Sequence, residues 1–496
     1  MATRTIVNRQ IRSFAFVWTG ITLTIGVAVF FAIYLTYDTG NAALAAAESR
    51  VSLPLNNNNN SDNSGAPAVV AQPSPTEEIP TTPTPAMVAA AQAGSQPEEA
   101  QSTPIGVTPL SSMSSDNQAE VTPQPTPRPI EQRDEFFVGV QVQYSLDFNP
   151  DNQRVWMNDV RNLGLNWFKQ QVRWDEIERE PDVYDWSKLD LVVPVAEEYD
   201  MNVVASVVAA PAWAREPGVD TSVDGPPADY QDFADFLTEM LERYPGAFQA
   251  IEVWNEPNID REWMSAEGVS AASFVDLLRV AYTTIKNIDP SIIVISGAPS
   301  PTGGFVDQNG VVRAIDDFDY MDQMIAAGLL NYADCIGAHH NGYNVPPDVT
   351  WDNTPNDPDA LFRGPFDNPH HSWSFRSTLQ TYANKIAVAD GDQKLCVTEF
   401  GWASVADLDG YPPNFEFALD NTLEEQAEFT VEALNLMEEW DIVWIAIIWN
   451  LNYGPQAGWS TDSDNTPYSL IGPGFTRRPA FDAIAAWSAE RNQASN

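Results

Sequence analysis

Alternating strand and helix signals constrain the fold of this chain more than any other feature. From Phe136 onward, apolar runs of strand length alternate with amphipathic stretches of helical periodicity. Eight such units with no strand left over predict a closed (β/α)8 TIM barrel of the α/β class. An open doubly wound sheet fits less well, because no glycine-rich phosphate loop follows the first strand. The expected strands are Phe136–Gln143, Asn166–Trp174, Asn202–Ala210, Ala247–Glu256, Ser291–Ala298, Asp334–His340, Lys394–Glu399 and Ile442–Asn450.

Four stretches show the helical pattern most clearly. In the first of them, apolar side chains recur every three or four residues and form one face, as in a helix packed on a barrel. The others have the same periodicity, so we expect helices between the strands and one after the last strand. These stretches are Tyr230–Tyr244, Ala271–Ile288, Leu423–Trp440 and Pro479–Arg491.

Composition changes sharply before the barrel, so the 496 residues do not form one globular unit. Residues 1–13 are basic, and residues 14–37 are apolar and uncharged. That second stretch is long enough to cross the roughly 30 Å hydrocarbon core of a bilayer. Arginines before it predict a cytoplasmic N-terminus and an extracellular remainder. We therefore expect a single-pass signal-anchor in the cell membrane.

A cleaved signal peptide is the alternative, because Ala43-Leu44-Ala45 offers small residues to a peptidase, and the protein would then be secreted. Residues 38–133 are rich in Pro, Ser, Thr and Asn. Such a composition buries too little apolar surface to offset chain entropy, so we expect a disordered linker. Residues 134–496 then form the barrel domain.

The formal net charge of -44, from 25 basic and 69 acidic residues, restricts the partners. So negative a surface repels nucleic acid and anionic polysaccharides, whereas neutral molecules can approach. We expect membrane contact through the N-terminal helix only, and a monomer.

The two cysteines, Cys335 and Cys396, are too few for a disulfide scaffold or a thiolate zinc site. Both lie in apolar strands, so we expect small buried hydrophobic side chains. A disulfide between them is the alternative.

Two expected strands end in a glutamate. The fourth closes on Asn255-Glu256-Pro257, and the seventh closes on Thr398-Glu399. The carboxyl ends of barrel strands share one rim, where barrel chemistry takes place. Two carboxylates on one rim suit glycosidic bond cleavage, with one as proton donor and the other as nucleophile or base. A negative Glu399 is expected to keep Glu256 protonated.

Strand parity predicts a further contact. Lys169 and Arg173 share one face of the second strand, and Glu252, Trp254 and Glu256 share one face of the fourth. Even-numbered strands fill the same interior layers of a barrel. We therefore expect Lys169 to pair with Glu252 below the rim, while Arg173 reaches the rim.

With these residues placed, the chain resembles glycoside hydrolase clan A over nearly all of residues 136–490. The motif Trp254-Asn255-Glu256-Pro257-Asn258 is similar to that clan's Asn-Glu-Pro motif, and Thr398-Glu399-Phe400-Gly401-Trp402 to its nucleophile strand. Within the clan it looks closest to the β-xylosidase and α-L-iduronidase family or to the cellulase-type endoglucanase family. The resemblance implies a retaining glycosidase with Glu256 as acid/base and Glu399 as nucleophile.

The resemblance also implies substrate-binding residues. Asn255 matches the residue that bonds the sugar 2-hydroxyl, and Arg173 matches the rim arginine that holds the nucleophile ionised. Trp449, at the end of strand eight, matches the tryptophan beneath the sugar. After strand six we choose His339 and Tyr343, with His340 in reserve.

No metal or organic cofactor is expected. His339 and His340 are adjacent, as are His370 and His371. Neighbours on a strand point to opposite faces, so a strand pair is a poor chelate. The expected partner is a β-linked oligo- or polysaccharide. A transglycosylase and an inert glycan-binding barrel are the alternatives.

Overall fold

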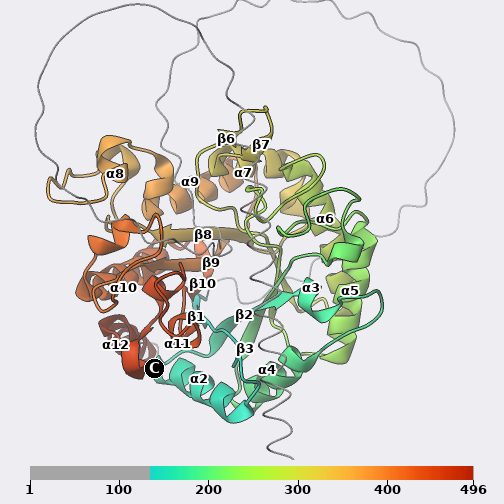
Figure 1. The fold of residues 1–496 in the computed structure, drawn as a ribbon, viewed down its shortest axis with the longest axis horizontal. Coiled ribbons are helices and arrows are strands. Elements are labelled where there is room, and N and C mark those ends of the chain that lie inside the picture. Colours follow the sequence, from blue (N-terminus) through green and yellow to red (C-terminus); the bar gives the residue numbers. More distant parts are fainter. Residues whose placement is uncertain (1–134, 495–496) are drawn as a thin grey trace, which may run out of the picture. The chain divides into compact units, whose positions relative to one another are not determined.

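The computed structural model of the chain describes residues 135–494, and these form a closed parallel barrel (Figure 1). Hydrogen-bonded neighbours follow the order β5-β4-β3-β2-β1-β10-β9-β8. A parallel bridge between Ile295 and Cys335 closes the ring between β5 and β8. The predicted TIM barrel is confirmed. Its strands are β1 (Phe137–Gln141), β2 (Trp167–Arg173), β3 (Asn202–Val208), β4 (Ala250–Val253), β5 (Ile293–Ser296), β8 (Ile336–Gly342), β9 (Leu395–Trp402) and β10 (Val443–Ile448).

Helices surround this barrel (Figure 1). The four predicted helices are present, and α10 has the predicted bounds. The α-helices are α2 (Pro150–Asn162), α3 (Trp174–Ile177), α4 (Ser187–Glu198), α5 (Tyr230–Arg243), α6 (Ala271–Ile288), α7 (Asp317–Ala326), α8 (Gly364–Asp367), α9 (Phe375–Val388), α10 (Leu423–Trp440), α11 (Tyr453–Gln456) and α12 (Pro479–Ala494).

Short elements decorate the loops between them. Two small antiparallel hairpins and seven 3-10 turns fill the described rim and connections. They are β6 (Phe305–Val306), β7 (Val312–Ala314), β11 (Ile471–Gly472), β12 (Thr476–Arg477), η1 (Ala212–Ala214), η2 (Leu329–Asn331), η3 (Trp351–Asn353), η4 (His371–Trp373), η5 (Glu416–Leu419), η6 (Thr466–Tyr468) and η7 (Pro473–Phe475).

Local sequence explains where α10 begins. The side chain of Thr422 accepts a hydrogen bond from the backbone N–H of Glu425, and the Glu425 carboxylate accepts one from the Thr422 N–H. This capping box satisfies two N–H groups that a helix start leaves without partners. The helix therefore starts at Leu423. It follows the loop after β9, the barrel strand that carries Glu399.

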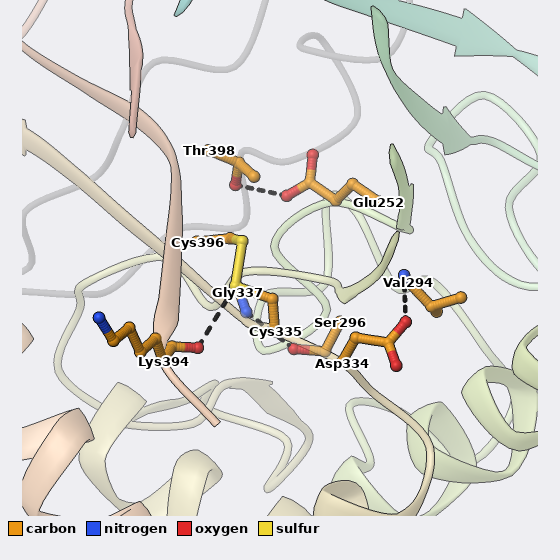
Figure 2. Close-up of a disulfide and its surroundings, with 9 residues drawn as sticks. All are labelled: Glu252, Val294, Ser296, Asp334, Cys335, Gly337, Lys394, Cys396 and Thr398. Atoms are coloured by element: carbon orange, nitrogen blue, oxygen red, sulfur yellow. Dashed lines mark hydrogen bonds between the residues drawn. A yellow bond between two sulfur atoms is a disulfide. The ribbon is translucent and has the colours of Figure 1, made fainter. Parts of the chain in front are cut away.

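An apolar layer fills the barrel interior below the polar side chains. Its members come from β2, β3, β4, β5, β9 and β10, and they are buried. This layer contains Cys335 and Cys396, which form a disulfide with Cα atoms 5.7 Å apart (Figure 2). The expectation of two separate hydrophobic side chains is therefore wrong. Both cysteines point inward from neighbouring strands, which brings their Cα atoms within disulfide range.

The predicted anchor (14–37) and linker (38–133) lie outside the described residues. Across residues 135–494, no helix has both the length and the apolar character needed to cross a bilayer.

Candidate active site

A polar layer lies directly on the apolar one inside the barrel. The Nζ of Lys169 from β2 is 2.8 Å from the Glu252 carboxylate of β4, and both side chains are buried. The Thr398 hydroxyl donates a hydrogen bond to the other carboxylate oxygen of Glu252 (Figure 2). The predicted pairing of Lys169 with Glu252 is confirmed. Burial would lower the pKa of Lys169, but Glu252 and Glu399 outweigh it and raise that pKa.

The same lysine reaches the first candidate catalytic residue. Lys169 Nζ is 3.2 Å from Glu399 Oε1 and donates to the Thr398 carbonyl oxygen at 3.3 Å. Glu399 lies within β9, which continues to Trp402 and so extends beyond the predicted strand end. The buried Lys169 also pairs with Glu252, so it bridges the two carboxylates. The structure therefore gives Glu399 a charge partner inside the barrel.

The second candidate, Glu256, follows β4 through a tight backbone turn. Strand pairing stops at Val253, and Trp254 and Glu256 have φ of 75° and 39°. Left-handed φ values are uncommon outside glycine and often mark functional sites. The Trp254 ring turns outward to Phe233 and Trp263, so the predicted shared face with Glu252 is wrong for Trp254. This turn brings Glu256 back to the barrel mouth.

Glu256 is held by two basic side chains. Arg261 NH2 lies 2.7 Å from its Oε2, and His339 Nδ1 lies 3.3 Å from its Oε1. Burial raises the pKa of Glu256, but Arg261 and His339 outweigh burial and lower this pKa to about 2. The expectation that Glu399 keeps Glu256 protonated is therefore wrong for the protein without substrate. The cause is the Arg261 guanidinium, which sequence reasoning overlooked.

His339 connects the two glutamates. Its Nδ1 faces Glu256, and its Nε2 is 3.8 Å from Glu399 Oε1 and 3.8 Å from Glu252 Oε1. Burial lowers the pKa of His339, whereas Glu399 and Glu256 raise it, and the net shift is upward. Because one imidazole ring contacts both carboxylates, Glu256 and Glu399 share one mouth.

His340 points the other way, into the layer between barrel and helices. Its ring meets Phe375 of α9 edge-on, and burial lowers its pKa to about 3. The choice of His339 over His340 as the residue facing the glutamates is thus supported by strand alternation in β8.

Asn255 lies beside Glu256 and is buried. Its Oδ1 is inaccessible and accepts no hydrogen bond from the described residues. A buried amide oxygen without a partner is costly, and a ligand hydroxyl would satisfy it. Because Asn255 Oδ1 is not accessible in the ligand-free chain, the sugar contact expected of Asn255 stays a prediction.

Arg173 reaches the rim at the end of β2, as predicted, but it does not face the nucleophile candidate. Its guanidinium pairs with Asp224 at 2.8 Å and with Asp175 at 3.1 Å. Within the described residues, the cation next to Glu399 is Lys169, one layer deeper. The contact predicted between Arg173 and the nucleophile candidate is therefore absent, because the loop after β3 supplies Asp224 as the partner of Arg173.

Tyr343 and Trp449 belong to an aromatic cluster above the mouth, the rim cluster. The Tyr343 ring packs edge-on against Trp373, with centroids 4.6 Å apart, and at a tilt against Phe417, with centroids 4.9 Å apart. Burial and then the charge of Glu256 raise the pKa of Tyr343. Trp449 is partly buried, packs on this cluster, and lies 5.1 Å from the Tyr453 ring. Tyr343 thus lies near enough to Glu256 to be affected by its charge, whereas the contacts of Trp449 are with the cluster and Tyr453.

Three further residues of the mouth were not predicted. Arg261 and Glu262 follow the Asn-Glu-Pro turn, and burial raises the pKa of the partly buried Glu262 to about 8. Tyr453 accepts a hydrogen bond from Gln141, and its raised pKa reflects burial and, among weaker causes, Glu399. The run of three charged residues Asp260-Arg261-Glu262, two positions after Asn258, was the available sequence signal for Arg261 and Glu262.

Comparison with known proteins bears on the fold. No protein-family model matches this sequence, and no curated protein matches it. A solved family 39 glycoside hydrolase from the gut symbiont Bacteroides cellulosilyticus WH2 matches with a TM-score of 0.52 and 17% identity, over 72% of this chain. This chain spans 64% of that protein's chain.

Xylanase 10B from Thermotoga maritima matches with a TM-score of 0.47 and 16% identity, over 74% of this chain and 99% of its own. The first of these two similarities bears on the fold alone, and it agrees with the (β/α)8 barrel that residues 135–494 form.

Proposed function

We propose that this protein is a retaining glycoside hydrolase that cleaves β-linked glycans by double displacement through a covalent glycosyl-enzyme. One observation carries the proposal: the His339 imidazole contacts two buried carboxylates, Glu256 and Glu399, at the carboxyl end of a barrel. A retaining mechanism needs two such groups about 5–5.5 Å apart.

Glu399 acts as the nucleophile. Its carboxylate attacks the anomeric carbon as an anion, and the buried ammonium of Lys169 at 3.2 Å supports this charge in the free enzyme. Attack discharges the carboxylate and forms the glycosyl-enzyme. Glu252 then remains as the partner of Lys169, so no buried charge is left unpaired.

Glu256 acts as the acid and then as the base. To donate a proton to the leaving oxygen it must first be protonated, which the Arg261 contact at 2.7 Å opposes. Substrate binding therefore draws Arg261 away from Glu256, and the pKa of the carboxyl rises as the cation leaves. In the second step the ionised Glu256 takes a proton from water, and water displaces the sugar from Glu399.

The substrate is a neutral β-linked oligo- or polysaccharide. Asn255 bonds the 2-hydroxyl of the sugar at the cleavage point, which strengthens an oxocarbenium-like transition state. Trp449 supports the C–H face of that sugar, and Tyr343 borders it. The net charge of -44 disfavours polyanionic glycans.

The same proposal includes a location. Residues 14–37 anchor a monomer in the cell membrane, residues 38–133 link it to the surface, and the barrel works outside without a cofactor. The disulfide supports this location because disulfides persist in oxidising compartments. Secretion after cleavage near Ala45 is the alternative.

A transglycosylase is the main alternative activity, with a second sugar in place of water at the glycosyl-enzyme. An inert glycan-binding barrel is the other, but it leaves the cation beneath Glu399 without a purpose.

The test is hydrolysis of aryl β-glycosides and of β-glucan, xylan and mannan oligosaccharides by the full chain. Wild type is compared with Glu399→Ala and Glu256→Ala, each with and without azide. We expect Glu399→Ala to be inactive and azide to restore turnover as a glycosyl azide of inverted configuration. Glu256→Ala should lose roughly 10²–10⁴-fold in rate, and most for poor leaving groups.

The control is a carboxylate at the rim. The Asp175→Asn variant should retain activity, because the Asp175 side chain pairs with Arg173 and contacts neither glutamate. Binding of a glycan without cleavage of any substrate would support the inert barrel instead. Products longer than the substrate would identify a transglycosylase.

A further inference from the structure

Three side chains outside the barrel mouth gather a carboxylate oxygen and two imidazole nitrogens. Asp316 Oδ2 lies 2.9 Å from His371 Nε2 and 3.4 Å from His370 Nε2. All three atoms lie within 4.8 Å of one another. Ligand atoms of a tetrahedral zinc ion, with bonds of about 2.0–2.1 Å, are about 3.3 Å apart, so the spacing matches.

Neighbouring groups fix the orientation of both rings. His371 Nδ1 lies 3.6 Å from Asp317 Oδ1, and His370 Nδ1 lies 2.9 Å from Ser372 Oγ. In the ion-free chain His370 Nδ1 accepts the Ser372 N–H at 3.3 Å, so binding an ion at Nε2 requires the ring proton to move to Nδ1, where Ser372 Oγ can accept it. Asp317 is buried and accepts a hydrogen bond from the Tyr382 hydroxyl at 2.8 Å, so its carboxylate cannot swing away. In metal sites, a ligating histidine typically gives its other N–H to such a group.

The third ligand is also positioned in advance. Asp316 caps α7 by accepting the Phe318 N–H with Oδ1 at 2.9 Å, which leaves Oδ2 directed at the histidines. The His371 ring stacks on Phe318, with ring centroids 3.6 Å apart. The Asp316 carboxylate thus caps the helix with one oxygen and faces the histidines with the other. Because its position is already fixed, binding an ion costs it little conformational entropy.

We propose that Asp316, His370 and His371 form a site for a divalent transition-metal ion, Zn²⁺ in particular. Two imidazoles and one carboxylate are ligands that Zn²⁺ accepts, with water in the fourth position. The side chains of His370 and Asp316 are 33% and 21% exposed, so solvent reaches the ion. His339 and His340 point to opposite faces of a strand, but His370 and His371 lie at the start of a 3-10 turn. The side chains of this second pair can therefore reach the same ion.

The ion would connect two parts of the rim. Asp316 precedes α7, and the histidines belong to the long loop between β8 and α9, where His370 precedes η4 and His371 begins it. The last residue of η4, Trp373, packs on Tyr343 in the rim cluster. A bound ion thus fastens the loop that carries this cluster, and it acts as a structural staple.

The experiment is Zn²⁺ titration of the full chain after chelator treatment, with a competing chromophoric chelator, and Co²⁺ absorption as a second readout. Wild type should bind one Zn²⁺ per chain and give the visible bands of tetrahedral Co²⁺. His370→Asn and Asp316→Asn should each bind at least tenfold more weakly. His370→Asn keeps an acceptor for the Ser372 N–H, and Asp316→Asn keeps the cap of α7.

Asp319→Asn is the matched control, because it removes a charge from the same first turn of α7 without touching the cluster. It should bind Zn²⁺ like wild type. Metal-free melting temperatures of all variants verify that each is folded. The proposal is overturned if wild type takes up no Zn²⁺, or if His370→Asn, Asp316→Asn and Asp319→Asn bind it equally.

Discussion

The two glutamates of the mouth have the same side chain but opposite surroundings. Glu399 rests on a buried ammonium inside the barrel, whereas Glu256 is held from the rim by Arg261. A cation inside a packed barrel cannot leave, while one on a rim loop can. In the proposed mechanism, the nucleophile Glu399 therefore keeps its charge partner throughout, whereas the acid/base Glu256 can lose its partner and change its protonation.

This difference yields a prediction for Arg261→Ala. Removing the guanidinium removes a cause that lowers the pKa of Glu256, so this pKa rises from about 2. Protonated Glu256 then persists to higher pH, and the basic limb of the kcat/KM profile moves up by at least about one pH unit. The measurement is kcat/KM against pH for wild type and variant.

Arg261→Lys serves as the control, since it keeps a positive charge in the same loop and should leave the limb nearer its wild-type position. If the basic limb of the Arg261→Ala profile stays in place or moves to lower pH, Arg261 does not lower the pKa of the catalytic acid Glu256.

At the scale of elements, the periodicity of strands and helices was enough to predict most of the barrel. The bounds of α10 follow from a capping box and helical spacing, both encoded within a few residues. The end of β4 could not be predicted, because no glycine marks the left-handed φ at Trp254 and Glu256. Tertiary packing decides that turn.

Partners distant in sequence were harder to predict than the residues themselves. Lys169 and Glu252 were paired correctly because barrel parity links alternate strands. Arg173 was assigned the wrong partner, since Asp224 comes from a loop whose path has no periodic signal. Arg261 was missed for the same reason.

The disulfide between the start of β8 and β9 leads to a prediction about stability. It closes a loop over a sequence separation of 61, which restricts the unfolded chain. The Cys335→Ala/Cys396→Ala variant should lose about 2–4 kcal/mol of unfolding free energy. The measurement is denaturant unfolding of wild type and variant, with and without reductant.

Reductant should destabilise wild type and leave the double variant unchanged, which separates the bond from the cavity that alanine creates. Two reactive thiols in denatured, unreduced wild type would contradict the disulfide.

At the scale of the whole molecule, the acidic balance and the disulfide agree with an extracellular barrel. A net charge of -44 keeps the protein soluble and repels polyanions, while the bond requires an oxidising compartment. Both features fit the proposed function, in which neutral glycans outside the cell are the substrates. The sequence before the barrel determines whether the protein stays at the membrane.

The last prediction concerns this N-terminal sequence. The full chain should remain in the membrane fraction after an alkaline wash and begin at its own N-terminus, because residues 14–37 are longer than the 7–15-residue core of a signal peptide. A variant without residues 1–37 should not bind membranes. If the mature chain instead begins after Ala45 and appears in the medium, and Ala45→Leu blocks its release, then the segment is a cleaved signal and the barrel works as a secreted enzyme.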